Sequence, residues 1–260
     1  MKNPLNKRFP RELKSDLGKY AAIFIFVTLM IGFVSGFLIA GSSMKKSYDE
    51  SFDKYNIEDG NFELTDKAND ALFDAMESKN IKLYENFYIE EKTAELDSTL
   101  RIFANRDEVN LICLMSGEFP ETADEIAIDR VYAQNNNLSV GDTLTAGNKS
   151  LKITGFVALS DYSALFQSPS DMMFDTLKFG VGIMTADGFN NMPHTHIHYS
   201  YSWKYDHTPK NDAEAKSLSE DMLPVLAANA SIKEFIPAYI NQAIIFTGDD
   251  IGSDSAFMPI

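Results

Sequence analysis

The feature that most constrains this chain is an uncharged apolar stretch near its beginning. Residues 21–41 read AAIFIFVTLMIGFVSGFLIAG. As an α-helix rising about 1.5 Å per residue, this stretch is about 32 Å long, which matches a hydrocarbon core of about 30 Å. The alternative is a cleaved signal peptide, but the apolar region of such a peptide is usually about 7–15 residues long. We therefore predict one membrane-spanning helix over residues 20–43.

Charges on either side of this helix predict its orientation. Residues 1–19 contain six basic and two acidic side chains, a net charge of +4. The whole chain has a net charge of −15, so the residues after position 19 carry −19. Positively charged flanks stay in the cytoplasm, so the main domain is expected outside it, at the cell membrane. The tail either forms a basic amphipathic helix at the inner lipid surface or is a solvated flank. Such an acidic outer part would repel phosphate backbones, so we expect no nucleic-acid partner.

The rest of the chain mixes helix and strand patterns, which predicts an α+β fold. A helical stalk is expected over residues 44–59, an extracytoplasmic α+β domain over 60–245, and the approach to a second membrane helix over 246–260. Strand patterns occur at 61–65, 81–96, 99–106, 172–185 and 194–205, and a helix pattern at 211–230.

The segment GEFPETADEIAIDRVYAQNNNLSVGDTL, residues 117–144, predicts a compact folded unit. Ile126 and Ile128 fall on one side of a short strand, a brief helix follows, and Leu138 and Val140 are expected to re-enter the core. Residues 142–159 predict a hairpin that turns at Ala146-Gly147-Asn148. We expect Gly141 and Gly147 to be structural turn residues.

No pattern in the sequence indicates catalysis. The stretch GDTLTAGNKS (141–150) has one residue too many between its glycines for a phosphate-binding loop. The chain also has no G-x-S-x-G, H-E-x-x-H or G-x-G-x-x-G motif. The carboxylates Glu118, Glu121, Asp124 and Glu125 have no histidine nearby in the sequence, which favours a solvated loop over an acid–base pair. We predict that the chain is not an enzyme and binds no cofactor itself.

The four histidines fall within a short segment, at positions 194, 196, 198 and 207. On a strand, His194, His196 and His198 would share one face about 7 Å apart, and two of them with a third ligand could bind Zn²⁺. The ordinary interpretation is a polar strand face, so we predict no metal site and keep these three as the candidates. The aromatic residues at 199, 201, 203 and 205 are expected to pack on a core rather than to form a binding platform. Cys113, the only cysteine, is expected to be a buried apolar residue.

Taken together, two stretches resemble the FtsX/MacB-like family of ABC transporter permeases. One is RFPRELKSDLGKYAAIFIFVTLMIGFVSGF (9–37), where a basic tail leads directly into the first span, and the other is the 117–144 segment followed by LKITGFVAL (151–159). The resemblance implies a first transmembrane helix, a large extracytoplasmic domain and further spans. It also implies that a separate cytoplasmic ABC ATPase subunit binds ATP, and that a second permease copy or pseudo-dimer half is present.

From this resemblance we predict that the chain is a non-enzymatic membrane component of an ABC transporter. Its partners would be the ATPase subunit and the lipid bilayer, and the sequence would represent a truncated permease because further spans are absent from it. The alternative is a self-contained, single-pass membrane-anchored domain that binds an extracellular ligand or acts as a sensor. An anchored or secreted hydrolase is a third class, which the lack of a nucleophile and base pair disfavours.

Overall fold

The structure is a computed structural model that describes residues 14–192 and 196–256. Its contacts divide the chain into two compact units, residues 1–48 with 251–260, and residues 49–250. The long helix α2 (Leu17–Lys54) contains no buried side chain. Within the described residues it is the only helix long and apolar enough to span a bilayer. It covers the predicted span of residues 20–43.

The stalk helix ends earlier than predicted. α2 stops at Lys54 rather than at residue 59, and Asn56 adopts a left-handed backbone with φ of 43°. The chain after the helix is then held by backbone hydrogen bonds, from Asn110 N to Asn56 O at 3.0 Å and from Leu111 N to Tyr55 O at 2.8 Å. Long-range contacts therefore fix where the helix ends, and the local spacing of aromatic residues did not reveal them.

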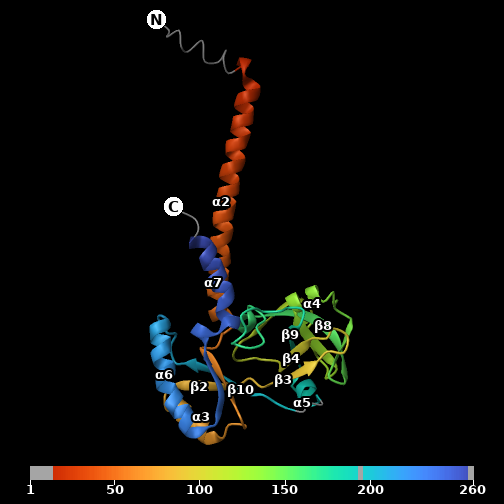
Figure 1. Ribbon diagram of the computed structural model, residues 1–260, viewed down its shortest axis with the longest axis vertical. Helices are drawn as coiled ribbons and strands as arrows, with labels where there is room; N and C mark the ends of the chain where they lie inside the picture. The colour runs from red at the N-terminus through yellow and green to blue at the C-terminus, as the bar shows by residue number, and fades with distance from the viewer. Residues whose placement is uncertain (1–13, 193–195, 257–260) are drawn as a thin grey trace. The chain divides into compact units, whose positions relative to one another are not determined.

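Residues 49–250 contain a four-stranded antiparallel sheet in the order β11-β1-β10-β2. Its strands are β1 (Gly60–Leu64), β2 (Ile81–Glu85), β10 (Tyr199–Tyr205) and β11 (Ile232–Pro237). Helices α3 (Asp70–Glu77) and α6 (Asp212–Asn229) contact each other and cover this sheet (Figure 1). Their buried Leu72, Met76, Met222 and Leu226 pack with Phe62 and Trp203 of the sheet. Burial of this apolar face holds the helices on the strands.

A second, seven-stranded mixed sheet has the order β3-β4-β9-β6-β8-β5, with β7 also paired to β8. The strands are β3 (Tyr88–Lys92), β4 (Thr99–Ala104), β5 (Ile112–Gly117), β6 (Glu125–Asp129), β7 (Thr143–Ala146), β8 (Lys149–Leu159) and β9 (Phe179–Met184). The short helices α4 (Arg130–Asn135) and α5 (Ala186–Asn190) contact its strands. An isolated bridge between Thr93 and Ala146 links the end of β3 to β7, so the sheet curls toward closure.

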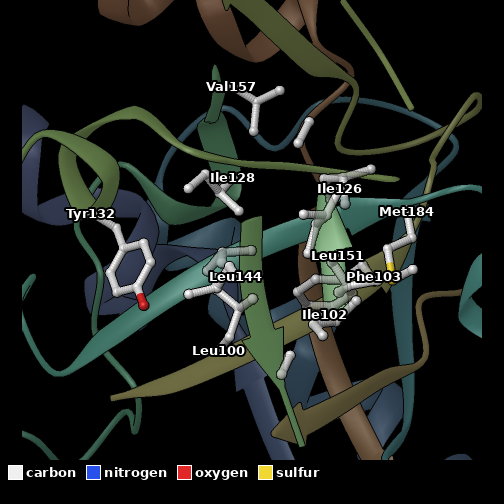
Figure 2. Packing of buried hydrophobic residues seen from close by; sticks show 14 of the residues in the cluster. Leu100, Ile102, Phe103, Ile126, Ile128, Tyr132, Leu144, Leu151, Val157 and Met184 are labelled. Carbon is white, nitrogen blue, oxygen red and sulfur yellow. The ribbon is translucent and has the colours of Figure 1, made fainter. Parts of the chain in front are cut away.

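The interior of the seven-stranded sheet is a continuous apolar core. Figure 2 shows Leu100, Ile126, Leu144 and Leu151 converging there with Tyr132 from α4. All five are fully buried. The phenol oxygen of Tyr132 lies 2.6 Å from Ser98 Oγ, so its one polar atom is satisfied. As predicted, Ile126 and Ile128 are buried on β6, and β7 and β8 form the hairpin.

The seven-stranded sheet is inserted in the chain between β2 and β10. The segment 81–96, predicted as one strand run, therefore breaks at Asn86 and Phe87, with β2 in one sheet and β3 in the other. The chain returns to the first sheet through residues 193–198, of which 193–195 lie outside the described residues. The mixed helix and strand content agrees with the predicted α+β class.

Some local predictions were wrong. Residues 172–178 do not form a strand, and Met172 is 97% exposed. Val140 is exposed rather than in the core, while Leu138 packs against the core as expected. Cys113 is half-buried on β5, near the exposed Met115, rather than fully buried.

The chain after β11 is helical. The short turn η2 (Ala238–Ile240) leads into α7 (Gln242–Ala256), where Ala243 packs with Ala164 and Phe166 from the loop after η1 (Ser160–Tyr162). The predicted approach to a second membrane helix, residues 246–260, falls in α7 as far as Ala256. Residues 257–260 lie outside the described part of the chain.

Candidate functional site

A group of buried polar side chains, here called the polar seam, lies among the connections of the two sheets. Its members are Glu58, Asn86, Asn110 and Ser202, each less than a tenth exposed. Glu58 follows α2, Asn86 lies between β2 and β3, Asn110 precedes β5, and Ser202 is on β10. The seam thus joins the four-stranded sheet to the start of the inserted segment and to its β4–β5 connection.

Glu58 is the centre of the polar seam. One of its carboxyl oxygens accepts from Asn61 Nδ2 at 2.5 Å, and the other accepts from Asn110 Nδ2 at 2.7 Å and Ser202 Oγ at 2.5 Å. Burial raises the pKa of the Glu58 carboxyl, and the negative charge of Asp161 raises it further, against the lowering effect of these hydrogen bonds. Glu58 therefore tends to hold a proton that an exposed glutamate would release.

Two arginines line or approach the seam with carboxylate partners. Arg106 Nη1 lies 2.6 Å from Asp161 Oδ2, and both side chains are almost fully buried. Arg101 donates to Glu90 from Nε at 3.0 Å and from Nη2 at 2.5 Å, and its guanidinium lies over the Tyr88 ring at 4.4 Å. These pairs keep the buried charges compensated, as buried ions require.

The enclosed space within this region is small. A cavity of about 70 Å³ is lined by Glu58, Glu63, Tyr88, Arg101 and Asp161, among other residues. That volume has room for a few water molecules, but it is well below the roughly 300–1,000 Å³ of a pocket for a drug-sized ligand. This enclosed cavity can therefore hold protons and water but not a substrate-sized ligand.

Glu63 on β1 is the second focus of charge. Its Oε1 is 2.9 Å from His198 Nδ1 and 2.5 Å from Lys233 Nζ, and its Oε2 accepts from the Tyr88 hydroxyl at 3.0 Å. Burial by itself raises the pKa of Glu63, but the hydrogen bonds from His198 and Lys233 outweigh it and bring the value to about 2. Glu63 is thus an ionised, mostly buried carboxylate with three partners.

Two of the four histidines lie beside Glu63. His196 and His198 have ring centroids 4.8 Å apart, and a ligand atom from each lies within 4.8 Å of one on Glu63. His207 is exposed and contacts Asp206 and Glu214 instead. His194 lies outside the described residues.

The aromatic series on β10 belongs to the core. Tyr201 and Trp203 are fully buried, and Tyr199 and Tyr205 pack against the same cluster. Trp203 stacks on Phe235 with centroids 5.0 Å apart. The predicted packing role is confirmed, and this series forms no open platform.

The glycines and the acidic loop have local structural roles. Gly141 and Gly147 have φ of +99° and +61°, a region that glycine adopts without strain. Glu125 accepts backbone hydrogen bonds at 3.0 Å from Glu121 N and Thr122 N, and these bonds lower its pKa. Residues 141–150 form a turn and part of the β7–β8 hairpin instead of leading into a helix, so no phosphate cradle forms there.

Sequence reasoning missed Glu58, Glu63, Tyr88 and Lys233. Lys233 contacts Glu63 across 170 positions of sequence and His198 contacts it across 135, so no local spacing could indicate these contacts. The clustered histidines were the one available signal in the sequence. They identified His196 and His198 but not Glu63, which lies beside them.

No protein-family model matches the chain, and no curated protein matches it significantly in sequence. Solved structures similar to it include two transporter domains. The periplasmic region of MacB from Actinobacillus actinomycetemcomitans has 12% identity and a TM-score of 0.40, covering 77% of this chain and 93% of that one. The extracellular domain of the noncanonic ABC-type transporter YknZ from Gram-positive bacteria has 10% identity and a TM-score of 0.36, covering 67% and 100%.

Proposed function

We propose that this chain is a membrane component of an ABC transporter, in which a cytoplasmic ATPase subunit drives motion of an extracytoplasmic domain. The observation that carries the proposal is α2, a continuous helix of 38 residues whose apolar part has no buried side chain and whose end leads directly into an α+β domain. That order of parts is what the sequence resemblance to FtsX/MacB-like permeases implies.

The chemistry of the domain supports a non-enzymatic role. Arg106 and Asp161 form a buried ion pair, Glu58 is held by hydrogen bonds from neutral side chains, and the enclosed cavity beside Glu58 and Asp161 is too small for a substrate. The 117–144 block that carries the resemblance forms β6, α4 and mostly exposed turns rather than a reactive site. The proposed work of the domain is to bind a partner or substrate and move, while the ATPase supplies the chemistry.

Photo-crosslinking in native membranes tests this proposal. Lys14, on the cytoplasmic side of the proposed span, is replaced by a photo-reactive phenylalanine in the full chain, and the crosslinked products are identified by mass spectrometry. We expect a subunit that carries a G-x-x-x-x-G-K-[ST] phosphate-binding loop. The same replacement at Met172, which is 97% exposed on the other side of the proposed membrane, is the matched control and is expected to capture no such subunit.

A second candidate is a self-contained anchored domain that binds a ligand outside the cell. The group of Glu63, His196 and His198 is the specific observation in its favour, because it places three metal-binding side chains together. The same experiment separates the two candidates. If Lys14 captures no ATPase subunit, or if Lys14 and Met172 capture it equally, the transporter proposal is wrong and the anchored domain takes its place.

A further inference from the structure

The side chains of Glu63, His196 and His198 converge near the start of β10. One ligand atom can be taken from each side chain so that all three lie within 4.8 Å of one another. Glu63 is buried, His198 is half-buried and His196 is exposed. A tetrahedral ion with bonds of about 2.0–2.1 Å needs ligand atoms roughly 3.3 Å apart, so modest side-chain rotation completes the set.

Two of the three ligands are held in place by strand pairing. Glu63 lies on β1, in register with Ser200 of β10 and Glu234 of β11. The backbone of His198 forms a bridge with Tyr88, with His198 N donating to Tyr88 O at 2.9 Å. The His198 ring also stacks on the Tyr88 ring at 4.3 Å with an interplanar angle of 9°. His196 is the mobile partner, because its exposed side chain is free to rotate onto an ion.

We propose that Glu63, His196 and His198 form a binding site for a divalent transition-metal cation of the Zn²⁺ class. Two imidazoles and one carboxylate are a ligand set that such ions favour, and three protein ligands leave a fourth position for water or a partner group. The Tyr88 hydroxyl, 3.0 Å from Glu63 Oε2, supplies the outer hydrogen bond that orients a ligating carboxylate.

Neighbouring charged side chains balance the negative charge of Glu63 when no metal ion is bound. Lys233 Nζ contacts Glu63 Oε1 at 2.5 Å and is half-exposed, so its flexible chain is able to leave for solvent. Glu234 lies opposite Glu63 on the adjacent strand, so the two carboxylates repel each other. A bound dication would take over the role of the Lys233 ammonium and relieve the repulsion between these two carboxylates.

Competition between Lys233 and a metal ion for Glu63 predicts a pattern of variant effects that an isolated surface histidine would not show. Removing Lys233 removes a cation that occupies the Glu63 oxygen, so metal affinity should rise. Removing His196 deletes a ligand, so affinity should fall. His207 offers a matched control, because it is an exposed histidine that also contacts two carboxylates, Asp206 and Glu214.

The test titrates the full chain in detergent micelles with Zn²⁺ against a chelating dye and with Co²⁺ by visible absorption, at pH 7.5, where imidazoles are mostly neutral. We expect His196→Ala to weaken binding at least about tenfold. Lys233→Ala is expected to strengthen it severalfold, and His207→Ala to leave it unchanged. Fluorescence of Trp203, the single tryptophan, verifies that each variant is folded.

Three outcomes would overturn the proposal. The first is that His196→Ala binds Zn²⁺ as tightly as the parent. The second is that His207→Ala loses Zn²⁺ binding, and the third is that Lys233→Ala binds Zn²⁺ no tighter than the parent. The Lys233 variant keeps the test decisive even if a histidine variant fails to fold, because a half-exposed lysine is dispensable for the core. Failure of this metal site would leave the transporter proposal untouched, since that proposal depends on the ATPase partner.

Discussion

Glu58 is a buried carboxyl whose ionisation affects the stability of the domain. Its ordinary pKa is 4.5, and burial followed by the charge of Asp161 raises the value in the folded protein. Above pH 4.5 the unfolded chain loses the proton while the folded chain keeps it, so the contribution of Glu58 to stability falls as pH rises toward the raised pKa. Below pH 4.5 that contribution is fully present.

Glu58→Gln should therefore become more stable relative to the parent as pH rises. A glutamine retains hydrogen bonds with Asn110 and Ser202 and does not titrate, and the Asn61 amide can flip to suit it. We expect the stability of Glu58→Gln relative to the parent to rise steadily between about pH 4 and pH 7, because only the parent has a carboxyl whose pKa is raised by folding. Thermal unfolding followed by Trp203 fluorescence measures it. A difference that does not change with pH would mean that Glu58 is ionised in the fold.

The buried pair of Arg106 and Asp161 should be far more sensitive than a surface pair. Asp161→Ala leaves the Arg106 guanidinium buried without its partner at 2.6 Å, which typically costs about 3–5 kcal/mol of unfolding free energy. Glu85→Ala breaks the exposed ion pair with Lys67 and is the matched control, with an expected cost below about 1 kcal/mol. Urea unfolding of both variants compares them. Equal losses would show that Asp161 is not a structural partner of Arg106.

The residues of these sites also show what sequence alone could provide. The spacing of His196 and His198 drew attention to them, because side chains two apart on a strand share a face. Glu63 and Lys233 come from β1 and β11, and only sheet pairing brings them to His198. A single sequence contains no local signal for a register across more than a hundred positions.

At the level of elements, local signals succeeded where the turn chemistry was strong. The β7–β8 hairpin and α4 were predicted because glycine, asparagine and aspartate fix their ends, with Asp129 capping α4 through its side chain. β5 and β11 were missed because neither alternates cleanly between buried and exposed positions. Only pairing with β8 and β1 makes them strands.

The positive-φ glycines should differ in cost according to their surroundings. Gly141 has open space where a side chain would start, so Gly141→Ala adds only backbone strain of about 1–2 kcal/mol. Gly117, with φ of +76°, would place that carbon against the backbone oxygen of Thr154, so Gly117→Ala must also disturb the pairing of β5 with β8. We expect Gly117→Ala to cost at least twice as much in thermal or urea unfolding. A larger loss at Gly141 would contradict the assigned turn geometry.

For the whole molecule, the first and last strands of the domain are neighbours. β1 begins shortly after α2 ends, β11 stops shortly before α7 begins, and Gly60 pairs with Pro237 between them. The chain therefore enters and leaves the domain at one pair of strands, and the seven-stranded sheet is inserted beyond them. Under the proposed coupling, a displacement at this entry point would reach the four-stranded sheet first.

That role requires α2 to lie in the bilayer, which charge substitution tests. A charged residue at the centre of a membrane helix costs about 2.5–3.5 kcal/mol, so the double variant Ile31→Arg with Val34→Arg should lose about 5–7 kcal/mol of insertion free energy. Both side chains are exposed on α2, so packing within the chain contributes nothing to the effect. We expect alkaline carbonate to release the double variant from membranes, while the parent stays in the pellet.

Met44→Arg is the matched control, because Met44 is exposed on the same helix but outside the predicted span of residues 20–43. A charge there meets water or lipid headgroups and should leave the protein in the pellet. Fluorescence of Trp203 in the released protein should remain that of a buried side chain, since the core around it lies in the separate compact unit 49–250. If the double variant stays in the pellet as the parent does, insertion of α2 is not what holds this chain at the membrane, and the coupling proposed here fails with it.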